Sequence, residues 1–169
     1  MKRALYLAFF LAIVSALAGG ALTLANNMTI DRINANKVAA DKASLELIYP
    51  GAEFLPIEGF DDATGLITNI YKAGDAGYVY KCAVNGFSGA GSIEFMVGFG
   101  TDGKIAGYTV ISCTDTKGIG DKVMQDSFVN SIVGKEVGAK IDTISGSTVS
   151  SSAVIGGIDA ATAHFKANY

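Results

Sequence analysis

The segment with the clearest chemical potential covers residues 141–151 and reads IDTISGSTVSS. It places several hydroxyl side chains and one glycine, Gly146, directly before a stretch with strong helical periodicity. Because a helix N-terminus carries unpaired backbone N–H groups and a partial positive charge, such a segment can bind a phosphate or another anion. The same residues suit an ordinary N-cap, in which Ser145 or Thr148 accepts a hydrogen bond from an N–H two or three residues further on. Composition alone leaves both interpretations open.

A second glycine-rich segment, TDTKGIGDK, occupies residues 114–122. Taken alone, it indicates a surface turn with solvated Asp and Lys side chains. Asp61 and Asp62, adjacent in the sequence, are most simply explained as part of a solvated loop.

The other reactive side chains are few. The two cysteines, Cys82 and Cys113, provide too few ligands for a zinc site. We expect two free thiols in strands, with one disulfide as the alternative if the domain lies outside the cytoplasm. The single histidine, His164, falls near the end of the last helix. It is expected at the surface, where the helix dipole favours a cation, and a proton-shuttle role is the alternative.

The elements that must position these residues begin with an apolar N-terminus. The chain has 169 residues and a mean hydropathy of +0.36, and most of the apolar excess lies in residues 4–25, which carry no charge. About 20 such residues are enough for a helix to span a bilayer. Lys2 and Arg3 precede the run, so the positive-inside rule predicts a cytoplasmic N-terminus and an extracytoplasmic remainder. A cleaved signal peptide ending near Ala16-Leu17-Ala18 is the alternative, and it would export the same domain.

The rest of the chain predicts one α+β domain with an antiparallel sheet flanked by helices. A helix over residues 29–48 should end at Tyr49-Pro50-Gly51, and further helices are expected over 121–133 and 149–167. Strands are expected over 66–72, 78–84, 92–99 and 104–112, and alternation in the third predicts one buried face. This gives a cytoplasmic tip and anchor over 1–25, a linking helix over 26–48 and a domain over 49–169. The net charge of −3 argues against a nucleic-acid partner.

Two of these motifs resemble those of a known family. DTISGST at residues 142–148 resembles D-x-x-[ST]-G-A-T, the flavin acceptor motif of the FMN-binding domain in the G subunit of Rnf complexes and the C subunit of sodium-translocating NADH:quinone reductase. In that family the last threonine, here Thr148, carries FMN through a phosphoester, and Ser147 stands where alanine is usual. The loop at 114–122 is similar to the family's E-T-P-G-L-G, with Asp115, Lys117 and Ile119 in place of Glu, Pro and Leu.

Weaker similarities lie at Gly86–Gly89, which resembles a G-Y-x-G turn, and at residues 47–52, which resemble a P-G-A helix stop. The motifs occur in family order along nearly the whole chain. The short length and the brief spacer after the anchor favour the Rnf subunit over the longer quinone-reductase subunit.

The resemblance implies a flavoprotein with covalently bound FMN. Because the FMN is attached through a phosphoester, it also implies a phosphoprotein. The implied cofactor-binding residues are Thr148, Ser145, Gly146, Ser147, Ser150, Asp142, Thr116, Lys117, Gly118 and Ile119. Asp142 would serve recognition of the motif or cap the turn, and Lys117 would stabilise a reduced, anionic flavin. The last helix would place the phosphodiester beside backbone donors.

The implied function is a single-pass membrane subunit that relays electrons within an ion-translocating ferredoxin:NAD oxidoreductase. Its implied partners are the other membrane subunits and a flavin transferase. No complete active site is expected in this chain alone, since its sequence has neither a Rossmann fingerprint nor a cysteine cluster. The alternatives are a C-type subunit of the quinone reductase, an exported flavodomain that serves an extracellular reductase, and a binding module whose Gly/Ser loop only caps a helix.

Overall fold

The computed structural model describes residues 2–169, except the side chains of residues 2, 4, 31, 32 and 34. The chain divides into two compact units, Met1–Ala40 and Asp41–Tyr169, which we describe separately. In chain order the elements are α1 (Lys2–Ile48), β1 (Phe54–Ile57), β2 (Ile67–Ala73), β3 (Gly77–Gly86), β4 (Gly89–Gly100), β5 (Ile105–Cys113), the 3-10 helix η1 (Gly120–Met124), α2 (Asp126–Ile132) and α3 (Thr148–Asn168). The predicted α+β class is confirmed, while the predicted boundaries at 25 and 48 remain a prediction.

Helix α1 is continuous from Lys2 to Ile48 and runs without a break through residues 26–29, which follow the apolar segment. Those four residues contain no proline or glycine, and Thr29 donates its hydroxyl hydrogen to the carbonyl of Ala25 at 2.8 Å. A threonine whose hydroxyl is hydrogen-bonded in this way destabilises a helix little, so the backbone hydrogen bonds of α1 continue through it. Of the helices in residues 2–169, α1 is the one long and apolar enough to cross a membrane. Its apolar side chains, such as Leu5 and Phe9, are exposed, as a lipid-facing helix requires.

The five strands form one antiparallel sheet in the order β1-β2-β3-β4-β5. The four strands predicted from the sequence correspond to β2–β5, and a turn through Asp102-Gly103 connects β4 to β5. The short edge strand β1 was missed because four residues, one of them Pro56, give too little alternation to detect.

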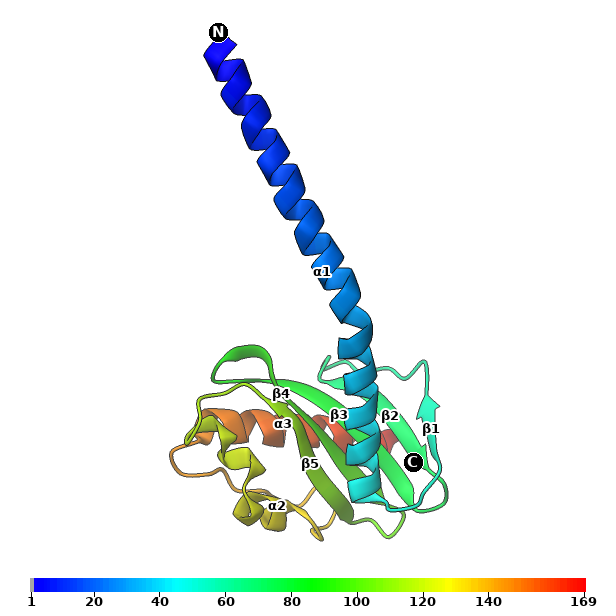
Figure 1. Cartoon of the computed structure of the whole chain (residues 1–169). Coiled ribbons are helices and arrows are strands. Elements are labelled where there is room, and N and C mark those ends of the chain that lie inside the picture. Colours follow the sequence, from blue (N-terminus) through cyan, green and yellow to red (C-terminus); the bar gives the residue numbers. More distant parts are fainter. Residues whose placement is uncertain (1) are drawn as a thin grey trace. The chain divides into compact units, whose positions relative to one another are not determined.

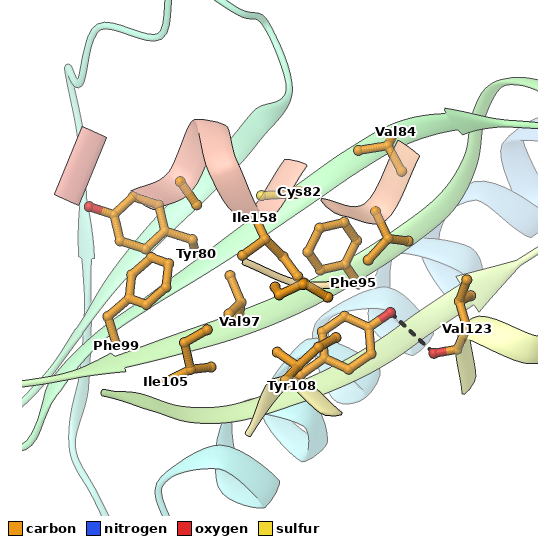
Figure 2. Close-up of a cluster of buried hydrophobic side chains, with 14 of the residues drawn as sticks. Tyr80, Cys82, Val84, Phe95, Val97, Phe99, Ile105, Tyr108, Val123 and Ile158 are labelled. Carbon is orange, nitrogen blue, oxygen red and sulfur yellow. Dashed lines mark hydrogen bonds between the residues drawn. The ribbon is translucent and has the colours of Figure 1, made fainter. Parts of the chain in front are cut away.

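The main core lies between the sheet and α3, which crosses one face of it (Figure 1). Phe95, Val97 and Phe99 of β4 point to this side and belong to one buried cluster with Ile158 of α3 (Figure 2). Tyr108 of β5 keeps its hydroxyl satisfied by donating to the Val123 carbonyl at 3.3 Å. The predicted apolar stripe of the last helix is confirmed, since Val154, Ile158 and Ala161 are buried and Phe165 packs against the cluster.

The other face of the sheet is also covered, contrary to the prediction for the third strand. Met96 on that face of β4 is fully buried with Leu45 and Ile48, which belong to the last turns of α1 within Asp41–Tyr169. Gly98 and Gly107, paired across β4 and β5, leave room there for Ile48. The strand's alternation gave no sign of this because residues such as Met96 and Gly98 do not distinguish a covered face from an open one.

The helix predicted over residues 121–133 is two elements, η1 and α2, separated at Gln125. Gln125 has an extended backbone, with φ −72° and ψ 144°, so it ends one element and begins the next. Continuous apolar periodicity through Val123, Phe128 and Ile132 hid this break, because both short elements bury their apolar side chains in the same core.

Candidate functional site

The site forms around the first turn of α3, which begins at Thr148. Ser147 is the N-cap residue, but its side chain makes no capping hydrogen bond. Although Ser147 is only 3% exposed, its Oγ has no hydrogen-bond partner among the described residues. The ordinary N-cap interpretation expected Ser145 or Thr148 to accept a hydrogen bond at the helix start. The structure instead has Ser147 as the N-cap, and the Ser147 side chain makes no capping hydrogen bond. The first N–H groups of a helix lack acceptors within the helix. Here the Ser147 side chain does not provide an acceptor for them.

The loop before α3 is held by Ser151, which sequence reasoning did not single out. Its Oγ accepts a hydrogen bond from the Ile144 N–H at 3.0 Å and lies 2.8 Å from the Ser147 carbonyl, to which it donates. Gly146 has φ +76°, a conformation that L side chains rarely adopt, and this turns the chain into the helix. The acceptor segment is thus fixed by local hydrogen bonds and one obligatory glycine.

A cavity of about 270 Å³ opens at this helix start. It is lined by Phe87, Ile119, Gly146, Ser147, Thr148, Val149 and Ser150. Three of these are large apolar side chains that face solvent: Phe87 is 69% exposed, Ile119 51% and Val149 55%. Thr148 is also exposed, so its hydroxyl is accessible for modification. The site therefore combines an apolar rim with the polar opening of a helix.

Asp115 is hydrogen-bonded to Phe87 and Ser150 of the cavity lining and is only 5% exposed. Burial raises its pKa, but hydrogen bonds from the Ser150 hydroxyl and from the Ser88 and Phe87 backbone N–H groups outweigh that effect and lower the pKa to about 2. The group is therefore a carboxylate at neutral pH. It ties together the β3–β4 turn, the loop after β5 and the first turn of α3.

Lys122 supplies a cation beside the acceptor segment. Its Nζ lies 3.4 Å from the Ser145 carbonyl, and a Cβ placed on Gly146 would lie 3.3 Å from it. The residue belongs to η1, which follows the glycine-rich loop. A positive charge here adds to the partial positive charge of the α3 N-terminus.

The structure brings together five of the ten predicted site residues and leaves five outside the cavity lining. Gly146, Ser147, Thr148, Ser150 and Ile119 line the cavity. The others are Ser145, Asp142, Thr116, Lys117 and Gly118, which lie in the loops on either side of it.

Two of the outer residues have identifiable contacts. Asp142 makes a solvated ion pair with Lys140 at 3.6 Å, and the N-cap of α3 is Ser147. The other role expected of Asp142, recognition of the motif, stays a prediction. The Gly118 N–H donates to Asp121 Oδ1 at 2.7 Å, which shapes the exposed loop. Whether these residues contact a cofactor stays a prediction.

Sequence reasoning missed Phe87, Val149 and Lys122 as site residues. Phe87 stands in the turn that resembles G-Y-x-G, and Lys122 ends the glycine-rich loop, so both carried a faint motif signal. Val149 lies in the segment 141–151, but it was expected only as the first residue of the last helix. It faces the cavity because it is the second residue of α3.

The remaining reactive groups lie outside this cavity. His164 is half-buried rather than at the surface, with its Nδ1 3.0 Å from the Tyr80 hydroxyl and its ring edge-on to Phe60. Cys82 and Cys113 are free thiols in β3 and β5, as expected. Burial raises the pKa of Cys82 to about 12, so this thiol is inert at neutral pH.

Comparison with known proteins finds relatives that match most of the chain. Three similar proteins are the G subunits of the ion-translocating oxidoreductase complex of Methanosarcina acetivorans, of the Na⁺-translocating ferredoxin:NAD⁺ oxidoreductase complex of Acetobacterium woodii and of the ion-translocating oxidoreductase complex of Pseudomonas aeruginosa. They are 27%, 28% and 27% identical to this chain, over 92%, 90% and 99% of it and 90%, 87% and 89% of their own lengths.

A family model described as the FMN-binding domain matches residues 86–163. The matched segment begins just before Phe87 and ends within α3, so it contains every residue that lines the cavity. Residues 86–163 of this chain therefore resemble the FMN-binding domain, and the chain as a whole is similar to G subunits of ion-translocating complexes.

Proposed function

We propose that this chain is a membrane-anchored flavoprotein subunit that relays electrons through FMN esterified to Thr148, within an Rnf-type ion-translocating ferredoxin:NAD oxidoreductase complex. The observation that carries the proposal is the position of Thr148. Its side chain is exposed at the first residue of α3, beside a cavity and next to an N-cap that leaves the helix N-terminus open.

The residues at this site suit the two ends of FMN. A phosphate is favoured where helix N–H groups converge, and the Lys122 ammonium adds charge of the right sign. The apolar rim of Phe87, Ile119 and Val149 suits a flat aromatic ring. At about 270 Å³ the cavity is close to the lower limit of ordinary ligand sites, about 300 Å³. The buried Ser147 hydroxyl is a further polar group close to the attachment point.

Attachment to Thr148 is a phosphoryl-group transfer and involves no change in oxidation state. A P–O bond forms to Thr148 Oγ1, and the bond between the flavin phosphate and its leaving group breaks. The hydroxyl proton passes to a base of the flavin transferase. Since water is a poor leaving group, the donor must be an activated flavin nucleotide in which the phosphate belongs to an anhydride. A covalent tether would retain the flavin outside the cytoplasm, where the cytoplasmic flavin pool cannot replace it.

Bound FMN supplies one- or two-electron transfer, and this chain supplies its binding and surroundings. Thr148 holds the phosphate end, the first turn of α3 and Lys122 offset its charge, and the apolar rim limits the access of water. The anionic Asp115 lies close to this site and disfavours additional negative charge nearby. Lys117, in the exposed loop, provides an opposing positive charge.

The membrane complex is the proposed setting because the similar proteins are subunits of ion-translocating complexes. Helix α1 would be the anchor, and the positive-inside rule applied to Lys2 and Arg3 before the apolar run supports an extracytoplasmic flavin domain. The flavin transferase would then act on that side as well.

Purification of the tagged full chain from its own membranes in mild detergent tests this function. A flavin-fluorescent band that survives denaturing electrophoresis, together with integral membrane proteins that copurify, is the expected result. A fluorescent band without membrane partners would favour the exported flavodomain. If the chain shows no such fluorescence although the transferase is present, covalent attachment is excluded and the binding module is favoured.

A further inference from the structure

Asp115 connects three segments that surround the cavity, although it does not line the cavity itself. Its Oδ2 accepts hydrogen bonds from the Phe87 N–H at 3.0 Å and from the Ser150 hydroxyl at 2.5 Å. Its Oδ1 accepts from the Ser88 N–H at 2.9 Å. One carboxylate thus holds the β3–β4 turn to the first turn of α3.

The packing around this carboxylate leaves no free space. A Cβ placed on either Gly86 or Gly120 would collide with the Asp115 side chain. Gly86 also donates its N–H to Ser92 Oγ at 2.8 Å, which fixes the base of the turn. Gly86 and Gly120, at the ends of β3 and η1, therefore allow the surrounding backbone segments to pack closely around the Asp115 carboxylate.

The turn held in this way carries Phe87, whose ring is 69% exposed and lines the cavity. The residues that follow, Gly89 to Gly91, are exposed. The two N–H groups that Asp115 binds belong to Phe87 and its neighbour Ser88. Through these bonds the position of the aromatic ring depends on a residue of a different segment.

We propose that Asp115 is the positioning residue of the flavin site: it fixes Phe87 against the first turn of α3, so that the aromatic ring and the Thr148 hydroxyl face one cavity. This inference rests on the proposed function, because it concerns where the flavin attached to Thr148 lies. Asp115 acts through Phe87, and without it a tethered flavin becomes mobile and open to solvent.

The test compares two aspartates with matching hydrogen bonds. Asp62, between β1 and β2, accepts from the Thr64 N–H at 2.9 Å, the Thr64 hydroxyl at 2.6 Å and the Ile67 N–H at 2.7 Å. It therefore binds two backbone N–H groups and one hydroxyl, as Asp115 does, but it does not line the cavity. Asp115→Asn and Asp62→Asn each place an amide NH₂ against donors, so each variant loses at least one hydrogen bond.

The measurements are made on the full-length, FMN-loaded chain in detergent. Both variants should have a lower Tm. Only Asp115→Asn should show a lower anisotropy of the flavin fluorescence and stronger quenching of that fluorescence by iodide. A purely structural role would not separate the two variants in this way.

Phe87→Ala provides a second test that does not depend on whether Asp115→Asn folds, because an exposed side chain adds little to stability. It should reproduce the loss of anisotropy and the increase in quenching. In the double variant, the effects should be no larger than in either single variant, since both changes act through one contact.

The proposal is overturned if Phe87→Ala leaves anisotropy and quenching at wild-type values, or if Asp115→Asn does not differ from Asp62→Asn in both. Failure of the proposed function looks different, because the wild-type chain would then carry no FMN after exposure to the transferase.

Discussion

The two adjacent glycines of α3, Gly156 and Gly157, should respond in opposite ways to substitution by alanine. A Cβ on Gly157 would lie 2.8 Å from Val84 Cγ1 and 2.9 Å from Phe95 Cζ, in the core between α3 and the sheet (Figure 2). A Cβ on Gly156 would meet nothing within 4 Å. One position is therefore where the helix packs closely on the sheet, and the other faces solvent.

These contacts determine how much each variant should change the free energy of unfolding. Gly156→Ala should stabilise by about 0.5–1 kcal/mol, the gain in helix propensity from glycine to alanine. Gly157→Ala makes the same gain, but overpacking in a dense core costs about 1–3 kcal/mol, so its net effect should be a loss of about 1 kcal/mol. The difference between the variants is then about 2 kcal/mol, or roughly 4–8 °C in Tm for a domain of this size.

The assay is thermal unfolding of the full chain in detergent, followed by near-ultraviolet circular dichroism of the buried tyrosines. Gly156→Ala is the matched control, because it makes the same chemical change one residue away. If both variants shift Tm in the same direction by similar amounts, α3 does not pack on the sheet through Gly157, and the placement of its first turn relative to β3 and β4 would be wrong.

Three further outcomes follow from the charged and reactive groups. The pKa of Asp115 is about 2 in the folded state and its ordinary value is 3.8, so the carboxylate should contribute about 2 kcal/mol of stability above pH 4. This contribution should be lost between about pH 4 and pH 2. Acid unfolding followed by circular dichroism should show no such pH-dependent loss of stability in Asp115→Asn. Asp41→Asn removes the 2.7 Å partner of the buried Lys81 and should lower stability in urea by about 1–2 kcal/mol, whereas the additional change Lys81→Met should recover most of that loss. In the native protein at pH 8, a thiol reagent should label Cys113, which is partly exposed, and should reach Cys82 only after unfolding.

The sequence was enough for the features that depend on local chemistry. The antiparallel order of β2–β5 follows from alternation and from the Asp102-Gly103 turn, and the end of α1 follows from Pro50. The start of α3 at Thr148 follows from the change from small polar residues to a helical stripe. These signals lie within a few residues of the features that they predict.

The features that were missed depend on contacts between distant segments. Asp115 had been interpreted as a loop residue, yet it is buried because Phe87, Ser88 and Ser150 converge on it. His164 is half-buried because Tyr80 of β3 provides its hydrogen-bond partner. No local pattern around either residue contains that information.

The central claim is the bond between FMN and Thr148, and peptide mass mapping tests it directly. The full chain, coexpressed with a flavin transferase in a host that exports it, should contain one FMN adduct on the peptide with Thr148. Thr148→Ala should abolish the adduct, whereas Thr143→Ala, at another exposed threonine of the same segment, should keep it. An unmodified wild-type chain, or an adduct that persists in Thr148→Ala, would contradict the account.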